Sequence, residues 1–334
     1  MKTLVYFDKD VRNVTFFYYD IILKAAAEAG FNVVSSDWNE YSSLNRNKDT
    51  YIFVTDIYDF FKLFMKGYRN FIYWFQGIVP EEHFMLSGNR SKIKYVVNSL
   101  LEYLPLKFCR YKFFVSEYLV NHYSKKYHLS LEKGDYFIMP CFNTDMHSES
   151  FEIEHKYEKN VFCYAGGLQM WQGFDKILDF YKLIESKRRN ASLRIYSKDV
   201  ENAKKLIEEH GISNYYVDCL PPEELDKELA KCKFGFILRE DNIVNNVATP
   251  TKLAAYVGNG VIPIYTSSIH SYRDLAVSHK YLCCIEDCSD IDPVLALMDE
   301  SQNPEDVYKD FKEVFDVYFN KDKYILAIQK YFSM

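Results

Sequence analysis

The chain alternates short apolar runs with longer segments of helical period. In the first half, runs rich in β-branched and aromatic residues predict strands near 2–7, 31–35, 50–55, 70–75, 111–115 and 135–139. Segments of helical period separate them, near 14–29, 57–66, 90–107 and 117–127. Strands that alternate with helices are typical of βαβ units, so this half predicts an α/β domain with a largely parallel sheet.

The same alternation starts again after a break. Pro140-Cys-Phe-Asn-Thr-Asp145 and the polar run up to Asn160 show no period, which predicts a linker. Further strands are expected near 160–165, 191–197, 213–218, 233–238, 261–265 and 280–285, with helices near 173–187, 199–209, 222–230 and 250–258. Residues 305–332 favour two helices that break near Asn320. Two α/β domains are predicted, with ligands beyond the carboxyl ends of the strands.

Length, charge and cysteine usage narrow the class of protein. A chain of 334 residues suits two domains, and its formal charge of −6 argues against a general nucleic-acid binder. No run of about 18 apolar residues is present, and the start of the chain lacks the pattern of a signal peptide. The eight cysteines have no zinc-type spacing, so we expect a cytoplasmic protein with reduced thiols.

The strongest local signal for chemistry is the segment from Phe234 to Ile264. Thr249 suits an N-cap and Pro250 the first helical position, so the amides of Thr251 and Lys252 would face outward at a helix N-terminus. Such an end attracts phosphate, and Arg239 at the preceding strand end can add a bidentate contact. The alternative, a Thr-Pro pair that only starts a helix, is about equally supported once both cations are counted.

A second signal is Tyr164-Ala-Gly-Gly-Leu-Gln-Met-Trp-Gln-Gly173, directly after the first strand of the second half. Gly166 and Gly167 allow a ligand to approach the main chain closely, although a tight strand-to-helix turn would need glycine as well. The segment is neither the dinucleotide fingerprint nor a Walker loop, which disfavours an oxidoreductase.

Other candidate groups carry weaker signals. The eight histidines are scattered without metal-ligand spacing, so no metal site is expected. Glu81, Glu82 and His83 follow the Gln76-Gly77 strand end and could meet an acceptor, although an exposed loop explains them more simply. Basic residues surround the apolar stretch 96–106, which suits peripheral contact with an anionic membrane, although a core-facing helix is slightly favoured. The basic residues are Arg90, Lys92, Lys94, Lys107, Arg110 and Lys112.

Together, the two segments of the second half resemble the C-terminal domain of family 4 glycosyltransferases, in the same order and about 70 residues apart. Pro-Thr-Lys-Leu-Ala-Ala-Tyr-Val-Gly-Asn-Gly-Val-Ile-Pro-Ile is similar to the helix and strand after their donor pocket. Val115-Ser116-Glu117 and the segment 140–145 are similar to their strand end and interdomain connection. The resemblance implies the GT-B fold: two Rossmann-like domains that face each other across a cleft, with the C-terminal helices crossing back to the first domain.

The resemblance also implies where substrates bind. Residues 1–145, with a final helix at about 320–334, would form the acceptor-binding domain, and residues 155–318 the domain for a nucleotide-sugar donor. Each site residue has an implied place, and no cofactor or metal is implied. Catalytic roles fall to Arg239, Lys252 and Glu240; donor contacts to Gly166, Gly167, Leu220, Glu224, Thr249, Thr251 and Tyr256; acceptor contacts to Gln76, Gly77 and Glu81.

The chain departs from the family pattern at several functional positions. Val247 and Ala255 stand where the family carries two glutamates separated by seven residues. Gly167 replaces the arginine of the glycine loop, and Gln172 replaces a lysine. Arg239 and Lys252 could restore the lost positive charge, and Glu240 or Asp241 a lost carboxylate.

The resulting prediction is a metal-independent glycosyltransferase that retains the anomeric configuration. It would transfer a sugar from a nucleoside diphosphate to a hydroxyl acceptor, on a surface glycan or a lipid-linked one, with or without contact to the inner face of the membrane. Two alternatives stay open. One is a non-catalytic GT-B-like partner or glycan-binding subunit, which the missing glutamates favour, and the other is a nucleotide-sugar epimerase of the same fold.

Overall fold

The computed structural model describes residues 2–10, 15–88 and 90–334. The chain divides into two compact units. The first unit contains Met1–Asn143 with the short segment Val247–Thr249 and the chain end Asn320–Met334. The second unit contains Thr144–Asn246 and Pro250–Phe319. The first unit is therefore built from parts of the chain that lie far apart in the sequence.

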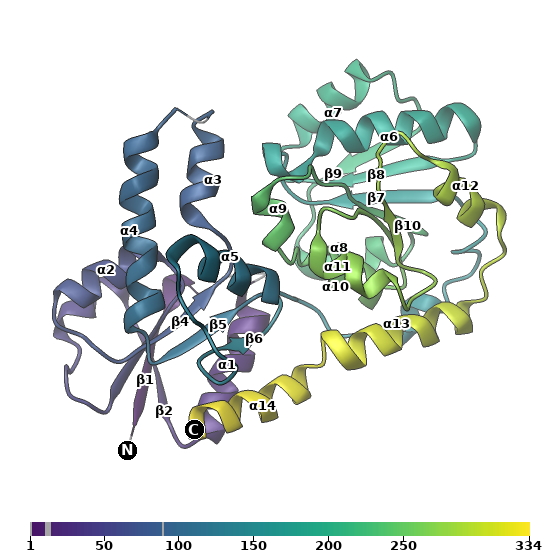
Figure 1. Cartoon of the computed structure of the whole chain (residues 1–334). Helices are drawn as coiled ribbons and strands as arrows, with labels where there is room; N and C mark the ends of the chain where they lie inside the picture. The colour runs from purple at the N-terminus through teal and green to yellow at the C-terminus, as the bar shows by residue number, and fades with distance from the viewer. Residues whose placement is uncertain (1, 11–14, 89) are drawn as a thin grey trace. The chain divides into compact units, whose positions relative to one another are not determined.

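The first unit has a six-stranded parallel sheet in the order β2-β1-β3-β4-β5-β6 (Figure 1). β3 and β4 are buried over their whole length, which explains why they are apolar without alternation. α14 packs against α1, and α4 packs against α2 and α3. The strands are β1 (Thr3–Phe7), β2 (Asn32–Ser36), β3 (Thr50–Val54), β4 (Phe71–Phe75), β5 (Tyr111–Phe114) and β6 (Phe137–Ile138). The helices are η1 (Asp8–Asp10), α1 (Phe16–Glu28), η3 (Trp38–Ser43), α2 (Ile57–Met65), α3 (Val79–Leu86), α4 (Lys92–Phe108), α5 (Glu117–Tyr127) and α14 (Lys321–Ser333).

The second unit repeats the architecture with the strand order β12-β11-β10-β7-β8-β9, again parallel throughout. Its strands are β7 (Val161–Ala165), β8 (Ser192–Tyr196), β9 (Tyr215–Asp218), β10 (Phe234–Ile237), β11 (Ile262–Thr266) and β12 (Cys283–Ile285). Its helices are η4 (Ser148–Phe151), η5 (Met170–Gln172), α6 (Phe174–Lys187), α7 (Val200–Glu209), α8 (Pro222–Leu229), α9 (Ile243–Val247), α10 (Lys252–Gly258), α11 (His270–Ala276), α12 (Asp292–Asp299) and α13 (Pro304–Tyr318). β7 and β10 are neighbours at the centre of the sheet, so the segments that follow them meet at one edge.

The twelve predicted strands and the parallel sheets are confirmed, with bounds that shift by at most a few residues. The predicted start of the helix after Thr-Pro is wrong, because α10 begins at Lys252 and its N-cap is Thr251. Thr249 does not cap it, since this buried side chain accepts a hydrogen bond from the Cys141 amide at 3.3 Å. No helix in the described part of the chain is long and apolar enough to cross a membrane.

Candidate functional site

A glycine loop and two cations meet at the carboxyl edge of the second sheet. The loop follows β7, and Lys252 opens α10. The Lys252 Nζ donates to the Gln172 Oε1 at 2.7 Å, and the Arg239 guanidinium, just beyond β10, donates to the main-chain oxygen of Trp171. The structure thus brings together the loop, Arg239 and Lys252, which sequence reasoning placed at one phosphate site.

Both cations are held by neutral oxygens. Within the described residues, neither Arg239 nor Lys252 forms a salt bridge; Arg239 donates a hydrogen bond to a main-chain carbonyl oxygen and Lys252 to a side-chain amide oxygen. Burial lowers the pKa of Arg239 to about 10. Burial, and then the charge of Arg239, holds the pKa of Lys252 well below its ordinary value. Two neighbouring cations without a carboxylate favour an anionic ligand, because an anion would offset the cost of desolvation.

The conformation of the loop explains its glycine. Gly166 has φ of 155°, and a Cβ there would lie 2.8 Å from both Cε and Nζ of Lys252. The Tyr164 hydroxyl donates to the Gly167 oxygen at 2.5 Å, which fixes the turn. A side chain at position 166 would therefore push the lysine out of place.

A cavity of about 400 Å³ lies beside Arg239. Arg239 is fixed there through its main chain, since its amide donates to the Thr266 hydroxyl at 2.9 Å. Glu240 is half exposed, and its Oε1 lies 3.4 Å from the Lys176 Nζ. The polar and charged lining residues are Lys176, Arg239, Glu240, Asp241, Thr266, Ser267, Ser268, His270, Arg273, Glu286 and Asp287. This cavity offers hydroxyl and carboxylate groups next to the cationic loop.

The other residues implied for the donor do not line the cavity beside Arg239. Tyr256 is fully buried, and its hydroxyl accepts from the Ala165 amide at 3.2 Å and donates to the Phe236 oxygen at 3.4 Å. It therefore joins the ends of β7 and β10 beneath the loop, without an exposed surface for a ligand. Leu220 and Glu224 lie after β9, at the far strand of the sheet, and Glu224 is exposed. Thr251 is half-buried, directly before α10.

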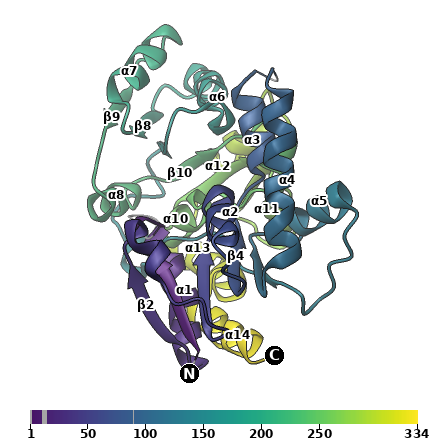
Figure 2. The ribbon, with the colours of Figure 1, turned by 90° about the vertical axis from the view of Figure 1, so that its left-hand side faces the viewer.

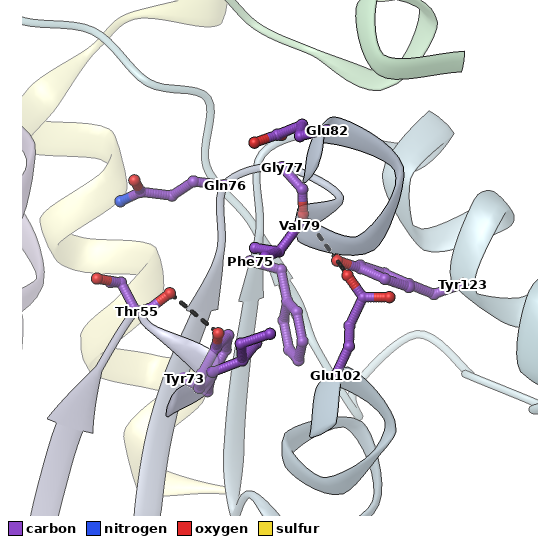
Figure 3. Close-up of a pocket in the computed structure, with 10 residues that line it drawn as sticks. Thr55, Tyr73, Phe75, Gln76, Gly77, Val79, Glu82, Glu102 and Tyr123 are labelled. Atoms are coloured by element: carbon purple, nitrogen blue, oxygen red, sulfur yellow. Dashed lines mark hydrogen bonds between the residues drawn. The ribbon is translucent and has the colours of Figure 1, made fainter. Parts of the chain in front are cut away.

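The first unit contains a second cavity, of about 220 Å³, at the carboxyl ends of β3 and β4 (Figure 3). Gln76 and Gly77, the predicted acceptor residues, line it. The Gln76 Nε2 is buried and has no hydrogen-bond partner within the described residues. The Gly77 oxygen accepts from the Tyr123 hydroxyl at 2.7 Å. The remaining lining residues are Thr55, Ile57, Tyr73, Phe75, Val79, Glu82, Glu102 and Tyr123.

Two carboxyl groups give this cavity its acidic character. Burial raises the pKa of Glu82, whose Oε1 accepts from the Ile78 amide at 3.1 Å. Burial also raises the pKa of Glu102, although the Lys126 Nζ lies 2.8 Å from its Oε2. Neither residue was a firm sequence candidate, because Glu82 was one of three loop residues and Glu102 lies on a helix with no motif.

Glu81 points into an ion-pair cluster and does not line the cavity. The Lys126 Nζ lies 2.8 Å from its Oε1, and the Tyr95 hydroxyl donates to the same atom at 3.0 Å. Burial alone would raise the pKa of Glu81, but the neighbouring His122 and Lys126 outweigh it and lower the pKa to about 2. The neighbouring Glu82 occupies the position that sequence reasoning gave to Glu81.

No group of three or more His, Cys, Asp or Glu side chains in the described ranges could hold a metal ion. Metal independence stays a prediction, since an ion held jointly with a substrate needs fewer protein ligands.

Among known proteins, similarity to this chain is found only with solved structures. No protein-family model and no curated protein matches the chain. Among solved structures, sucrose-phosphate synthase from Thermosynechococcus elongatus matches with a TM-score of 0.70 at 9% identity, over 100% of this chain and 98% of the synthase. Anabaena HepE, solved in complex with UDP-glucose, matches with a TM-score of 0.68 at 10% identity, over 100% of both chains.

A further similar structure is larger than this protein. Staphylococcus aureus TarM, solved in a complex that includes UDP, matches with a TM-score of 0.63 at 11% identity. The match covers 89% of this chain and 58% of TarM. Likenesses at such low identity show the fold, so the two units with parallel six-stranded sheets identify the chain as a protein of the GT-B fold.

Proposed function

We propose that the protein is a glycosyltransferase that transfers a sugar from a nucleoside diphosphate donor to a hydroxyl acceptor. The observation that carries the proposal is a pair of cations, the buried Arg239 and the half-buried Lys252, held by neutral oxygens around the glycine loop. Solved proteins of this fold, HepE and TarM, are in complex with UDP-glucose and UDP, respectively, which supports a nucleoside diphosphate as the ligand in this proposal.

The two cations suit the chemistry of sugar transfer. When the bond to the anomeric carbon breaks, the leaving diphosphate gains negative charge. Fixed cations in a site with little water stabilise that charge without having to reorganise during the reaction. In this proposal Arg239 and Lys252 bind the diphosphate, Gly166 allows its close approach, and Glu240 contacts the sugar from the adjoining cavity.

The cavity of the first unit supplies the acceptor side of the proposal. A hydroxyl can accept a hydrogen bond from the unpartnered Gln76 amide and donate one to Glu82. The two acidic groups, and the lack of a cation among the described residues that line the cavity, disfavour a phosphorylated group at this position. Glu82 replaces Glu81 as the proposed acceptor contact, because Glu81 is held by Lys126.

The finer features rest on the resemblance to family 4 enzymes. They are retention of the anomeric configuration, catalysis without a metal, and a role in the synthesis of surface polysaccharide or glycoconjugates. The non-catalytic alternative gains support from Val247, which stands where the family has a glutamate and offers only a main-chain oxygen, bonded to Ser116 at 2.8 Å. Hydrolysis of a donor sugar by the purified protein would separate an enzyme from a binding subunit.

Calorimetry with UDP, GDP, ADP and CMP tests the proposal. We expect one of the nucleoside diphosphates to bind. Lys252→Ala should lower its affinity by about tenfold or more, the usual effect of losing a charge-assisted hydrogen bond. Lys205→Ala, which removes an exposed lysine on α7, is the matched control and should bind as the wild type does. Binding by none of the nucleotides to folded protein would refute the transferase. Binding that survives Lys252→Ala would move the diphosphate site elsewhere.

A further inference from the structure

α4 exposes apolar side chains along one side of the first unit. Ile93, Val96, Val97 and Leu100 are 83, 55, 48 and 64% exposed. Their spacing of three and four residues places them on a single stripe of the helix, which we term the α4 face. Scattered apolar side chains are common on protein surfaces, but a continuous stripe over two helical turns points to a binding surface.

The opposite side of α4 is packed; it is polar behind the stripe and apolar farther along the helix, at Pro105 and Leu106. Asn98 and Glu102 are each 1% exposed. The Tyr58 hydroxyl donates to the Asn98 Oδ1 at 2.8 Å, and the Asn98 Nδ2 lies 2.9 Å from the His83 Nδ1. These bonds tie α4 to α2 and α3 through its polar side. Over the two turns of the stripe, the usual arrangement of a surface helix is therefore reversed: its polar side is packed and its apolar side is exposed. Rotating α4 to bury the α4 face would break these hydrogen bonds.

Basic side chains flank the α4 face on both sides. Lys92 lies along one margin and Lys94 along the other, and Lys107 lies two turns beyond Leu100 in line with the stripe. All three are exposed, as is Arg90 just before the helix. Within the described residues, Lys92 and Lys94 form no ion pair. Glu102 is the helix's only acidic residue and is buried, so the exposed side of α4 is apolar and positive.

The free end of α4 extends this surface. α3 and α4 lie side by side in both views of the ribbon (Figures 1 and 2) and form a helical hairpin at the edge of the first unit. Leu86, the last residue of α3, is also exposed at the end of this hairpin. Apolar side chains are therefore exposed from the tip of the hairpin along two turns of α4.

We infer that the α4 face docks the protein on a membrane surface with anionic lipids. An amphipathic helix with a basic margin lies in the headgroup region, where its apolar stripe enters the acyl boundary and its lysines meet phosphate groups. A second copy of the chain fits less well, because a twofold contact would set Lys92, Lys94 and Lys107 of one copy against those of the other. The inference rests on the exposed apolar and basic side chains of α4 and is independent of the proposed sugar transfer.

Sedimentation with lipid vesicles tests the inference on the full chain, without any nucleotide. The wild type should bind vesicles of phosphatidylglycerol and phosphatidylcholine in equal parts at least about tenfold more tightly than vesicles of phosphatidylcholine alone. Val96→Ser with Leu100→Ser should weaken that binding by about tenfold through loss of apolar insertion. Lys92→Glu with Lys94→Glu should abolish the preference for anionic lipid.

Two double variants serve as matched controls. Val317→Ser with Leu326→Ser removes exposed apolar side chains from α13 and α14, and Lys133→Glu with Lys227→Glu reverses exposed charges that are not on α4. Both should bind vesicles as the wild type does. Absence of binding to anionic vesicles, or equal binding by all four variants, would overturn the inference. A dimer in light scattering that Leu100→Ser dissociates would assign the α4 face to self-association instead.

Discussion

The charge next to the glycine loop depends on the protonation state of one side chain, Lys252. Burial, and then the charge of Arg239, lowers the pKa of Lys252, whose one hydrogen-bond partner within the described residues is Gln172. In the free protein this lysine therefore loses its proton at a lower pH than an ordinary lysine does. A bound diphosphate would restore the charged form, because an adjacent anion raises the pKa of an amine.

Binding of UDP should therefore take up a proton. As the pH rises through the lowered pKa of Lys252, the free lysine loses its proton and the affinity for UDP should fall. Calorimetry in two buffers with different heats of ionisation would measure the proton uptake. In Lys252→Arg the guanidinium stays charged, so proton uptake should disappear. The same proton uptake in both proteins would show that another group titrates.

Some site residues could be predicted from the sequence and others could not. Arg239 and Lys252 were predicted because a strand end and a helix start restrict where their side chains can lie. Glu82 was named only as one of three possible acceptor contacts and Glu102 was not named, because their role depends on how α3 and α4 pack against the sheet. Tyr256 was expected at the donor, but burial and two main-chain partners make it a support for β7.

At the scale of elements, the turn from β7 into the glycine loop has a backbone conformation that requires glycine at position 166. Gly166→Ala should weaken UDP binding, because a residue other than glycine is strained at φ of 155° and the new methyl group would displace Lys252. We expect a loss of about 1–3 kcal/mol in binding, measured by calorimetry. Gly211→Ala, at φ of 65° but far along the chain after α7, should cost stability and leave UDP binding unchanged. Equal effects of both substitutions on binding would contradict this role of the loop.

The strands were predictable because each is a compact apolar run bounded by polar residues. The elements that were not predicted, α3, α9, α11 and α12, are short, and tertiary contacts rather than periodicity hold such helices in place. The start of α10 was misplaced because Thr-Pro is a common helix-start pair, whereas here Thr249 bonds to a distant segment.

At the scale of the whole molecule, the first unit depends on the end of the chain. Phe332 is buried, with its ring centroid 4.9 Å from Tyr111 and 5.5 Å from Phe31. The Tyr111 hydroxyl also donates to the main-chain oxygen of Phe332 at 2.9 Å. α14 thus completes the core of a unit that begins at the opposite terminus.

Phe332→Ala should therefore lower the free energy of unfolding by about 3–5 kcal/mol, the usual cost of emptying a buried aromatic site. Urea denaturation followed by circular dichroism would measure it. Leu326→Ala, on the same helix but exposed, should change the stability by less than about 1 kcal/mol. A small effect of Phe332→Ala would mean that the first unit folds without α14.

This dependence has a consequence for synthesis on the ribosome. The second unit has all its strands in one continuous stretch, so the nascent chain can fold it as soon as that stretch emerges. The first unit emerges earlier but must wait for α14, which is translated after every strand of both sheets. During that interval a chaperone would find an unfinished apolar surface beside α1. A ribosome that stalled before α14 would release a chain whose earlier-made unit is the unstable one, and proteases would remove it from that end.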